Sequence, residues 1–306
     1  WCNSLFEDNA EFGYGMKLAQ NYNEAHMIQV MEEAKDACEP ELKETIEKYL
    51  SVKGQRSEEK AIVPELLKLV EASSNDAIKE VLDNKGNLVS KSQWIVGGDG
   101  WAYDIGYGGL DHVIANNENV NILVLDTEVY SNTGGQSSKS SQAGSIAKFT
   151  AGGKTGAKKD LAQIAMAYGH VYVAQIAMGA NPAQFLKAVT EAEAHKGPSL
   201  IIAYAPCISH GLRCGMSDVQ GEIKRAVEVG YWQLYRNNPE LIKEGKNPFI
   251  LDSKEPQGDF REFLRGEVRF SSLERTFPEA ADALFERTES EAKARYARYK
   301  ELAEKN

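Results

Sequence analysis

The sequence contains few cysteines and no closely paired ones. Four occur among 306 residues, and none of them forms a Cys-x-x-Cys motif. This chain alone therefore cannot complete a zinc or iron–sulfur site that needs four thiolates. Taken by themselves, the four cysteines are expected to be reduced thiols without a catalytic role.

The sequence also lacks long apolar runs and an excess of basic residues. No apolar run approaches the roughly 20 residues that span a bilayer, and no basic segment followed by an apolar one opens the chain. The formal net charge is −10, so a basic face that could neutralise the phosphates of a nucleic acid is not expected. We therefore expect a cytoplasmic protein that binds neither membranes nor nucleic acids.

Two polar, glycine-containing segments follow apolar runs that are typical of buried strands. Gly98-Asp99-Gly100-Trp101 follows the run 94–96, and the segment 126–136 follows the run 122–125. The glycines allow backbone N–H groups to approach an anion, and Asp99 offers an oxygen to a hard cation. Thr127, 28 positions beyond Asp99, and the carbonyl of Val129 add two further oxygens. The pattern predicts a site for Mg²⁺ and a diphosphate.

The spacing between the two segments leaves room for one helix. Residues 104–117 have an amphipathic pattern, and Asp104 is a candidate N-cap. A helix here would connect two parallel, adjacent strands. Both loops would then lie at the carboxyl edge of one sheet, where α/β folds bind ligands.

The remaining pattern predicts an α/β fold: a mostly parallel sheet with flanking helices and with helical and irregular additions. We expect a helical lead-in segment at 1–90 packed on the core, an α/β core at 91–236, and an extension at 237–306 that ends in a charged helix. The expected helices are 14–50 with a break at Glu39-Pro40, 64–71, 75–82, 161–168, 182–195, 218–236 and 279–305. The expected strands are 94–96, 122–125, 171–177 and 199–204, with short extended pieces at 249–253 and 268–271.

The long segment 131–159 is rich in Gly, Ser, Thr and Lys. Its length indicates a loop that serves the site, although a mobile surface loop would have the same composition. Within it, Asn132 has two interpretations. Its amide could hydrogen bond an oxygen of a reaction intermediate, or it could simply adopt a left-handed turn before Thr133.

Four separated motifs in this order resemble the pyruvate:ferredoxin (flavodoxin) oxidoreductases, a branch of the thiamine diphosphate enzymes. These enzymes have a diphosphate motif that begins Gly-Asp-Gly, and in most of them it ends at Asn, where this chain has Thr127. The Thr form, continued as Glu-Val-Tyr-Ser-Asn-Thr-Gly-Gly-Gln, resembles the oxidoreductase branch. The other matching motifs are the segment from Trp1 to Gly13, Ala147-Lys148-Phe149, and the segment from Tyr204 to Gly211.

The resemblance implies a thiamine diphosphate-binding fold and roles for individual residues. Asp99, Thr127 and Val129 would hold Mg²⁺, Asn132 would be catalytic, and Cys207 would be one ligand of a [4Fe-4S] cluster whose other ligands lie outside this chain. Cys214 has no matching role. Of the five histidines, His210 is close enough to Cys207 to tune a cluster or to hydrogen bond a loop. The residues implied in cofactor binding are Gly98, Asp99, Gly100, Trp101, Thr127, Glu128, Val129, Tyr130, Ser131 and Asn132.

The implied activity is the oxidative decarboxylation of pyruvate to acetyl-CoA and CO₂, with electrons passed through iron–sulfur clusters to ferredoxin or flavodoxin. The chain would be a carboxyl-terminal part that needs upstream domains of the same polypeptide, is inactive alone, and belongs to a homodimer. The alternatives are another 2-oxoacid oxidoreductase, for 2-oxoglutarate or indolepyruvate, an NADP-linked enzyme, or a non-catalytic subunit. A dinucleotide-binding domain is disfavoured because no Gly-x-Gly-x-x-Gly follows the first strand.

Overall fold

The computed structural model describes residues 7–305. They form two compact units, which are treated separately below. The α/β unit comprises the chain up to Phe12 together with everything from Trp94 onward, and the helical unit comprises Gly13–Gln93.

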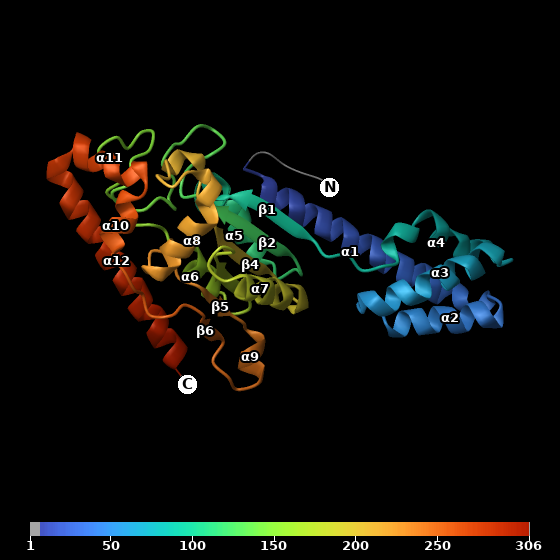
Figure 1. Cartoon of the computed structure of the whole chain (residues 1–306). Helices are drawn as coiled ribbons and strands as arrows, with labels where there is room; N and C mark the ends of the chain where they lie inside the picture. Colours follow the sequence, from blue (N-terminus) through green and yellow to red (C-terminus); the bar gives the residue numbers. More distant parts are fainter. Residues whose placement is uncertain (1–6, 306) are drawn as a thin grey trace. The chain divides into compact units, whose positions relative to one another are not determined.

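The α/β unit contains a six-stranded sheet (Figure 1). Its strand order is β1-β2-β4-β3-β5-β6, in which β1, β2, β4 and β3 are parallel and β5 pairs antiparallel with both β3 and β6. This arrangement confirms the predicted, mostly parallel α/β fold. The strands are β1 (Trp94–Gly98), β2 (Asn121–Asp126), β3 (Tyr172–Ile176), β4 (Ser199–Tyr204), β5 (Tyr235–Asn237) and β6 (Phe249–Leu251).

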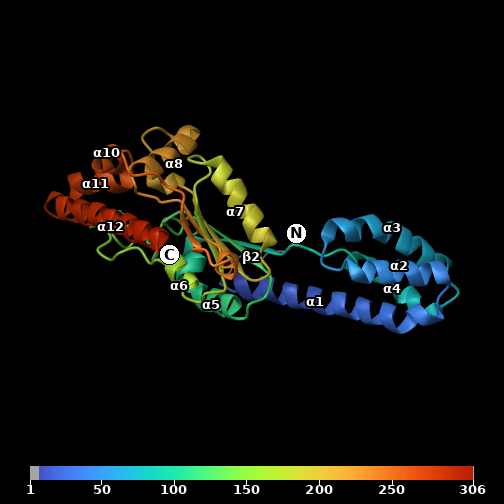
Figure 2. The ribbon, with the colours of Figure 1, turned by 90° about the horizontal axis from the view of Figure 1, so that it is seen from below.

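Helices cover both faces of this sheet. Figure 2 shows α5 (Tyr107–Ala115) and α6 (Leu161–Met166) on one face and α7 (Pro182–Ala194) on the other. Right-handed crossovers require this placement, because the chain moves outward from β1 through β2 to β3 and then returns through α7 to β4. The inner strands β3 and β4 are apolar and almost fully buried, as expected for parallel strands covered on both faces.

The crossover helix begins later than its sequence pattern predicts. Residues Gly100–Ile105 form a π-helical turn, η4, and α5 begins at Tyr107 with Gly106 in the N-cap position. Asp104 therefore does not cap this helix. Its carboxylate instead accepts the backbone N–H of Lys139 at 2.9 Å and pairs with the Lys139 ammonium at 3.0 Å. A side chain expected to begin a helix thus fixes the long loop.

Two further predictions in the α/β unit are wrong. The predicted helix 218–236 is α8 (Val219–Glu228), which ends before Gly230, a residue with φ of +76° that turns the chain toward β5. The predicted extended piece 268–271 is the first turn of α11 (Val268–Thr276). Its alternating pattern is misleading because Arg269, Phe270 and Ser271 are all buried. The remaining helices are α9 (Glu240–Lys243), α10 (Phe260–Arg265) and α12 (Pro278–Glu304).

The helical unit has its own apolar core, which includes Met31, Ile46 and Leu66, all fully buried. The predicted break at Glu39-Pro40 is confirmed, but α3 begins well before Pro64. The polar residues 56–60 are helical because Glu59 points inward, where its carboxylate accepts the N–H groups of Gly54 and Ser90. The elements of this unit are α1 (Asn9–Ala34), η1 (Lys35–Ala37), α2 (Pro40–Ser51), α3 (Arg56–Ala72), η2 (Asp76–Lys79), α4 (Glu80–Asp83) and η3 (Lys85–Asn87), and α1 starts within the α/β unit.

None of the helices within residues 7–305 is both long and apolar enough to cross a membrane.

Candidate diphosphate and metal site

Three neighbouring parallel strands end at the same edge of the sheet. Gly98 at the end of β1 lies opposite Leu125 of β2, and Asp126 at the end of β2 lies opposite Tyr204 of β4. The loops that carry Asp99, Thr127 and Cys207 therefore begin side by side. This edge is where the sequence predicted the site.

Asp99 directly follows β1 at this edge and is only 1% exposed. Its Oδ1 accepts the backbone N–H of Thr127 at 3.2 Å and the Thr127 hydroxyl at 2.7 Å. Its Oδ2 accepts the hydroxyls of Ser138 at 2.5 Å and Ser140 at 2.7 Å. A buried carboxylate without counter-charge requires such donors, so the first turn of the long loop is built around Asp99.

The three residues predicted to bind Mg²⁺ converge here. The Thr127 hydroxyl lies 2.9 Å from the carbonyl oxygen of Val129 and 2.7 Å from Asp99 Oδ1. One carboxylate, one hydroxyl and one carbonyl form an all-oxygen donor set that suits Mg²⁺, which takes its remaining ligands from water or phosphate oxygens. No group of three or more His, Cys, Asp and Glu side chains within residues 7–305 could hold a metal ion. The set of donors around Asp99 contains a single carboxylate, so oxygens of water or of a bound phosphate would have to complete the coordination of the ion.

A cavity of about 500 Å³ opens beside these residues. This volume lies within the range of roughly 300–1,000 Å³ that is typical of small-molecule sites. A Cβ at Gly98 would meet no atom within 4 Å, so the backbone there is open, whereas a Cβ at Gly100 would lie 2.5 Å from the Tyr130 ring. The predicted site residues that line the cavity are Gly98, Asp99, Gly100, Trp101, Thr127, Val129, Tyr130, Ser131 and Asn132.

Among the residues predicted to bind thiamine diphosphate and Mg²⁺, Glu128 is the one that lies outside the lining of this cavity. It is 1% exposed, and its carboxylate accepts hydrogen bonds from Lys158 at 3.1 Å and from the Tyr231 hydroxyl, and pairs with Arg269 at 2.9 Å. Its side chain points away from the cavity lining and belongs to a group of buried charged residues. We call this group the charge cluster: Asp126, Glu128, Lys158, Glu267 and Arg269.

Burial and opposite charge compete within the charge cluster. Desolvation raises the pKa of Asp126 to about 6, although the Lys158 ammonium lies 2.7 Å away. Desolvation also acts on Glu128, but Lys158 and Arg269 together outweigh it and lower the pKa of Glu128 to about 2. Of these two carboxylates, Glu128 is the one that has Arg269 as a second cationic partner. The surroundings therefore favour the charged form of Glu128 more than that of Asp126.

The charge cluster extends from the end of β2 to the start of α11. Arg269 Nε donates to Glu267 at 2.6 Å, and Glu267 Oε1 lies 3.7 Å from His210 Nδ1. His210 Nε2 lies 2.7 Å from the carbonyl oxygen of Thr127. The sequence pattern did not predict a role for Lys158, Glu267 or Arg269. Each is an ordinary charged residue in its local sequence, and only its burial distinguishes it.

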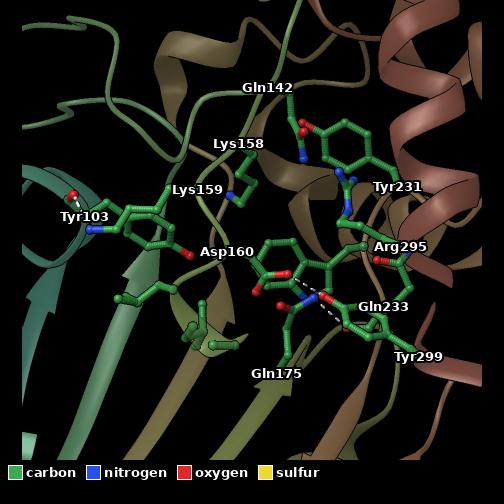
Figure 3. A pocket seen from close by; sticks show the side chains of 14 residues that line it. Tyr103, Gln142, Lys158, Lys159, Asp160, Gln175, Tyr231, Gln233, Arg295 and Tyr299 are labelled. Atoms are coloured by element: carbon green, nitrogen blue, oxygen red, sulfur yellow. Dashed lines mark hydrogen bonds between the residues drawn. The ribbon is translucent and has the colours of Figure 1, made fainter. Parts of the chain in front are cut away.

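A second cavity adjoins Lys158 and is much smaller, at about 30 Å³. Figure 3 shows Tyr103, Lys158 and Tyr231 around it, with Asp160 hydrogen bonded to Tyr299 at another wall. The volume is sufficient for water but not for a cofactor. The cavity of about 500 Å³ is the candidate ligand site because the residues predicted to bind the metal ion and the diphosphate line it.

The long loop is held in place by contacts at several points. Gln136 forms isolated bridges with Tyr130 and Lys148, and the Ile146 N–H donates to the Arg269 carbonyl at 2.8 Å. Lys154 donates to the carbonyls of Ser138 and Ser141 at 2.9 and 2.6 Å, and burial lowers its pKa to about 8. These contacts fix the loop that carries Asn132.

Cys207 follows β4 at the same edge and is half-buried. Burial raises the pKa of its thiol, but hydrogen bonds from Ser209 and from the Ser131 hydroxyl bring the pKa below the ordinary 9.0. A lowered pKa favours the thiolate, the form that binds metals. Cys214 is exposed on the following loop, and Cys38 lies in the helical unit. The α/β unit within the described residues thus offers one thiol at this edge.

Comparison with known proteins places this geometry in a family context. Residues 81–203 match the family described as thiamine pyrophosphate enzyme, C-terminal TPP binding domain. The pyruvate:ferredoxin oxidoreductase of Moorella thermoacetica is 54% identical over 99% of this chain and 26% of its own length. The pyruvate-flavodoxin oxidoreductase of Klebsiella pneumoniae is 53% identical over 99% of this chain and 26% of its own length.

A mitochondrial NADP(+) pyruvate dehydrogenase of Euglena gracilis is 44% identical over 99% of this chain and 17% of its own length. The chain thus spans about a quarter of the first two relatives and less of the third. The matches confirm the resemblance that the motifs predicted. Over its whole length, the chain is related to one part of the pyruvate:ferredoxin and pyruvate-flavodoxin oxidoreductases, a part that includes a thiamine diphosphate-binding domain.

Proposed function

We propose that this chain forms the diphosphate half of a thiamine diphosphate site in an enzyme that oxidatively decarboxylates pyruvate to acetyl-CoA and CO₂. The observation that carries the proposal is the convergence of Asp99 Oδ1, Thr127 Oγ1 and the Val129 carbonyl beside a cavity of about 500 Å³. The relatives named for pyruvate and for ferredoxin or flavodoxin support the choice of substrate and electron acceptor. A cytoplasmic location, a homodimer and further domains of the same polypeptide are parts of the same proposal.

The residues of this chain would bind and orient the cofactor. Asp99, Thr127 and Val129 would hold Mg²⁺, and the open backbone around Gly98 would approach the diphosphate. The rings of Trp101 and Tyr130 line the same cavity and would exclude water from it. Thiamine diphosphate supplies, when bound, a carbon nucleophile for the keto group of a 2-oxoacid.

Asn132 and Cys207 would serve the steps that follow binding. Asn132 is among the residues that line the cavity, and its amide would donate a hydrogen bond to the keto oxygen of the substrate as negative charge develops there. Cys207 would supply one thiolate to a [4Fe-4S] cluster, and the other ligands would come from outside this chain. Electrons would leave through such clusters to ferredoxin or flavodoxin, while coenzyme A accepts the acetyl group.

The role of Asn132 can be separated from cofactor binding. We expect Asn132→Ala to lower kcat by about 10²- to 10³-fold while the affinity for thiamine diphosphate changes little, because the amide acts on developing charge. Steady-state kinetics and a cofactor titration on the same full-length preparation measure both quantities. A variant with unchanged kcat would show that Asn132 only shapes the turn before Thr133.

The proposed activity itself is tested on the full-length protein with thiamine diphosphate, Mg²⁺, coenzyme A and pyruvate. The assay follows reduction of ferredoxin, flavodoxin or NADP⁺, and 2-oxoglutarate and an aryl pyruvate serve as competing substrates. The Euglena relative is the reason for including NADP⁺. Turnover that requires pyruvate and disappears in Asp99→Asn would support the proposal. Cofactor binding without turnover of any 2-oxoacid would favour a non-catalytic subunit.

A further inference from the structure

Glu128 adopts an unusual backbone conformation between two of the proposed metal ligands. Its φ is +53°, in the left-handed region that residues with a Cβ avoid. Because of this turn, the Val129 carbonyl faces back toward the Thr127 hydroxyl, 2.9 Å away. Such a conformation persists only where the surroundings determine it. The contacts around Glu128 are therefore relevant to the geometry of the metal site.

Contacts from two directions hold this turn. On one side, the Glu128 carboxylate is paired with Lys158 and Arg269. On the other, the carbonyl that precedes Glu128, that of Thr127, accepts a hydrogen bond from His210 Nε2 at 2.7 Å. A carbonyl can only accept, so Nε2 of this fully buried imidazole must carry its hydrogen.

His210 also connects the turn to two other segments. It lies in a 3-10 turn, residues Ile208–His210, directly after Cys207. The carboxylate near its other nitrogen is Glu267, whose Oε2 accepts from Arg269 at 2.6 Å. The imidazole thus joins the Cys207 loop to the Thr127–Val129 turn by one hydrogen bond, while Glu267 at the start of α11 lies near its other nitrogen without a hydrogen bond to it.

We propose that His210 is a positioning residue for the metal–diphosphate site. Its hydrogen bond to the Thr127 carbonyl orients the peptide bond between Thr127 and the left-handed Glu128. This orientation places the Thr127 hydroxyl and the Val129 carbonyl side by side. The inference rests on the proposed function, because the ion to be bound is the Mg²⁺ of that site. His210 does not line the cavity. It acts only through Thr127.

The test uses full-length protein and four variants, two at His210 and one each at His195 and Asp99, titrated with Mg²⁺ at a fixed concentration of thiamine diphosphate by calorimetry. His210→Met keeps the bulk but removes the donor, and His210→Gln keeps a donor at a similar distance along the side chain. We expect His210→Met to raise the Mg²⁺ concentration at half-saturation by about 10- to 100-fold, the usual effect of removing a partner of a metal ligand. We expect His210→Gln to restore affinity to within about threefold of the wild type.

The control is His195→Met. His195 is also buried, its Nε2 lies 3.0 Å from the His170 carbonyl, and its Nδ1 lies 3.2 Å from Glu240. It precedes β4 and is therefore at the opposite edge of the sheet from Asp99. Thermal unfolding is measured on every variant. A purely structural role for His210 would lower stability as His195→Met does and leave the Mg²⁺ titration unchanged, which would overturn the inference.

Asp99→Asn distinguishes the failure of the inference from the failure of the proposed function. Loss of Mg²⁺-dependent binding in Asp99→Asn, with wild-type binding in His210→Met, would refute only the role of His210. Wild-type binding in Asp99→Asn would refute the site itself. If His210→Met does not fold, His210→Asn replaces it, since its amide is one carbon shorter than that of Gln and cannot reach Thr127. Equal Mg²⁺ affinities of the Asn and Gln variants would then overturn the inference.

Discussion

Gly98 and Gly100 flank the same aspartate but have different surroundings. Nothing lies within 4 Å of a Cβ placed on Gly98, whereas a Cβ on Gly100 would meet the Tyr130 ring at 2.5 Å. Neither glycine has a positive φ. Of these two glycines, only Gly100 lacks room for a side chain within the packing of this chain.

Alanine substitution separates the two glycines. We expect Gly100→Ala to reduce the free energy of unfolding by about 1–3 kcal/mol, because the added methyl group must displace the Tyr130 ring or the backbone. Gly98→Ala should change it by no more than about 1 kcal/mol, in either direction. Urea unfolding of the 306-residue chain measures both. Equal losses would mean that Gly98 is as confined as Gly100.

At the scale of elements, β5, β6 and α7 are joined by one buried cation. Arg236 on β5 is 4% exposed and donates to Asp252, just after β6, at 2.8 and 2.9 Å. It also donates to Glu191 on α7 at 2.6 Å. These bonds attach the antiparallel edge of the sheet to a helix that covers it.

Removing this cation should loosen that edge. We expect Arg236→Met to cost about 3–5 kcal/mol of stability, because two carboxylates would lose the cation they are paired with in a poorly solvated position. Arg265→Met is the control: Arg265 pairs with Glu274 at 2.9 Å, but both are substantially exposed, so a cost of at most about 1 kcal/mol is expected. Chemical denaturation compares the two. Similar costs would show that burial does not determine the contribution of the pair.

In the helical unit, Glu39 connects the start of α2 to the end of α3. Its carboxylate accepts hydrogen bonds from the Ser74 N–H and from the hydroxyls of Ser73 and Ser74. These bonds, the Ser74 N–H first, lower the pKa of Glu39 from 4.5 to about 2. The charged form is therefore the one that the folded state favours.

The sign of the pH dependence follows. Since the folded pKa of Glu39 is depressed, its contribution to stability is complete above pH 4.5 and is lost as the pH falls toward 2. We expect the stability difference between wild type and Glu39→Gln to shrink across this interval. Urea midpoints measured by far-UV circular dichroism at several pH values provide the test. A difference that stays constant with pH would contradict the assignment.

At the scale of the whole molecule, the two units have separate apolar cores. The tryptophans of the described residues, at positions 94, 101 and 232, all fall within the α/β unit. Tryptophan fluorescence therefore reports on the α/β unit, while far-UV circular dichroism also reports on the helices of residues 13–93. The two signals allow the units to be followed independently.

A core substitution in the helical unit should affect only one signal. We expect Leu66→Ala, at a fully buried position, to destabilise the helical unit by about 2–5 kcal/mol. The transition seen by circular dichroism should shift or split, while the fluorescence transition of the 306-residue chain stays in place. Phe270→Ala, in the α/β unit, should shift the fluorescence transition. Coincident shifts in both signals would show that the units unfold as one.

Local sequence alone determined the parallel strands and the ligand edge. The apolar runs before Asp99 and Thr127, and the crossover length between them, predict two adjacent parallel strands because backbone hydrogen bonding and chain handedness leave little alternative. The break before Pro40 and the final charged helix are equally local signals. Family resemblance added the chemistry of the motif.

Only the tertiary structure decided how charged and polar side chains are used. Glu128 and Arg269 lie far apart in the sequence, and neither has a local pattern that distinguishes a buried ion pair from two solvated charges. The same holds for Glu59 inside α3, for Asp104, and for the helical start of α11 at Val268. Periodicity records how often a side chain faces the core. It does not record which distant residue offsets the free-energy cost of burying a charge, because that residue is brought close only when the chain folds.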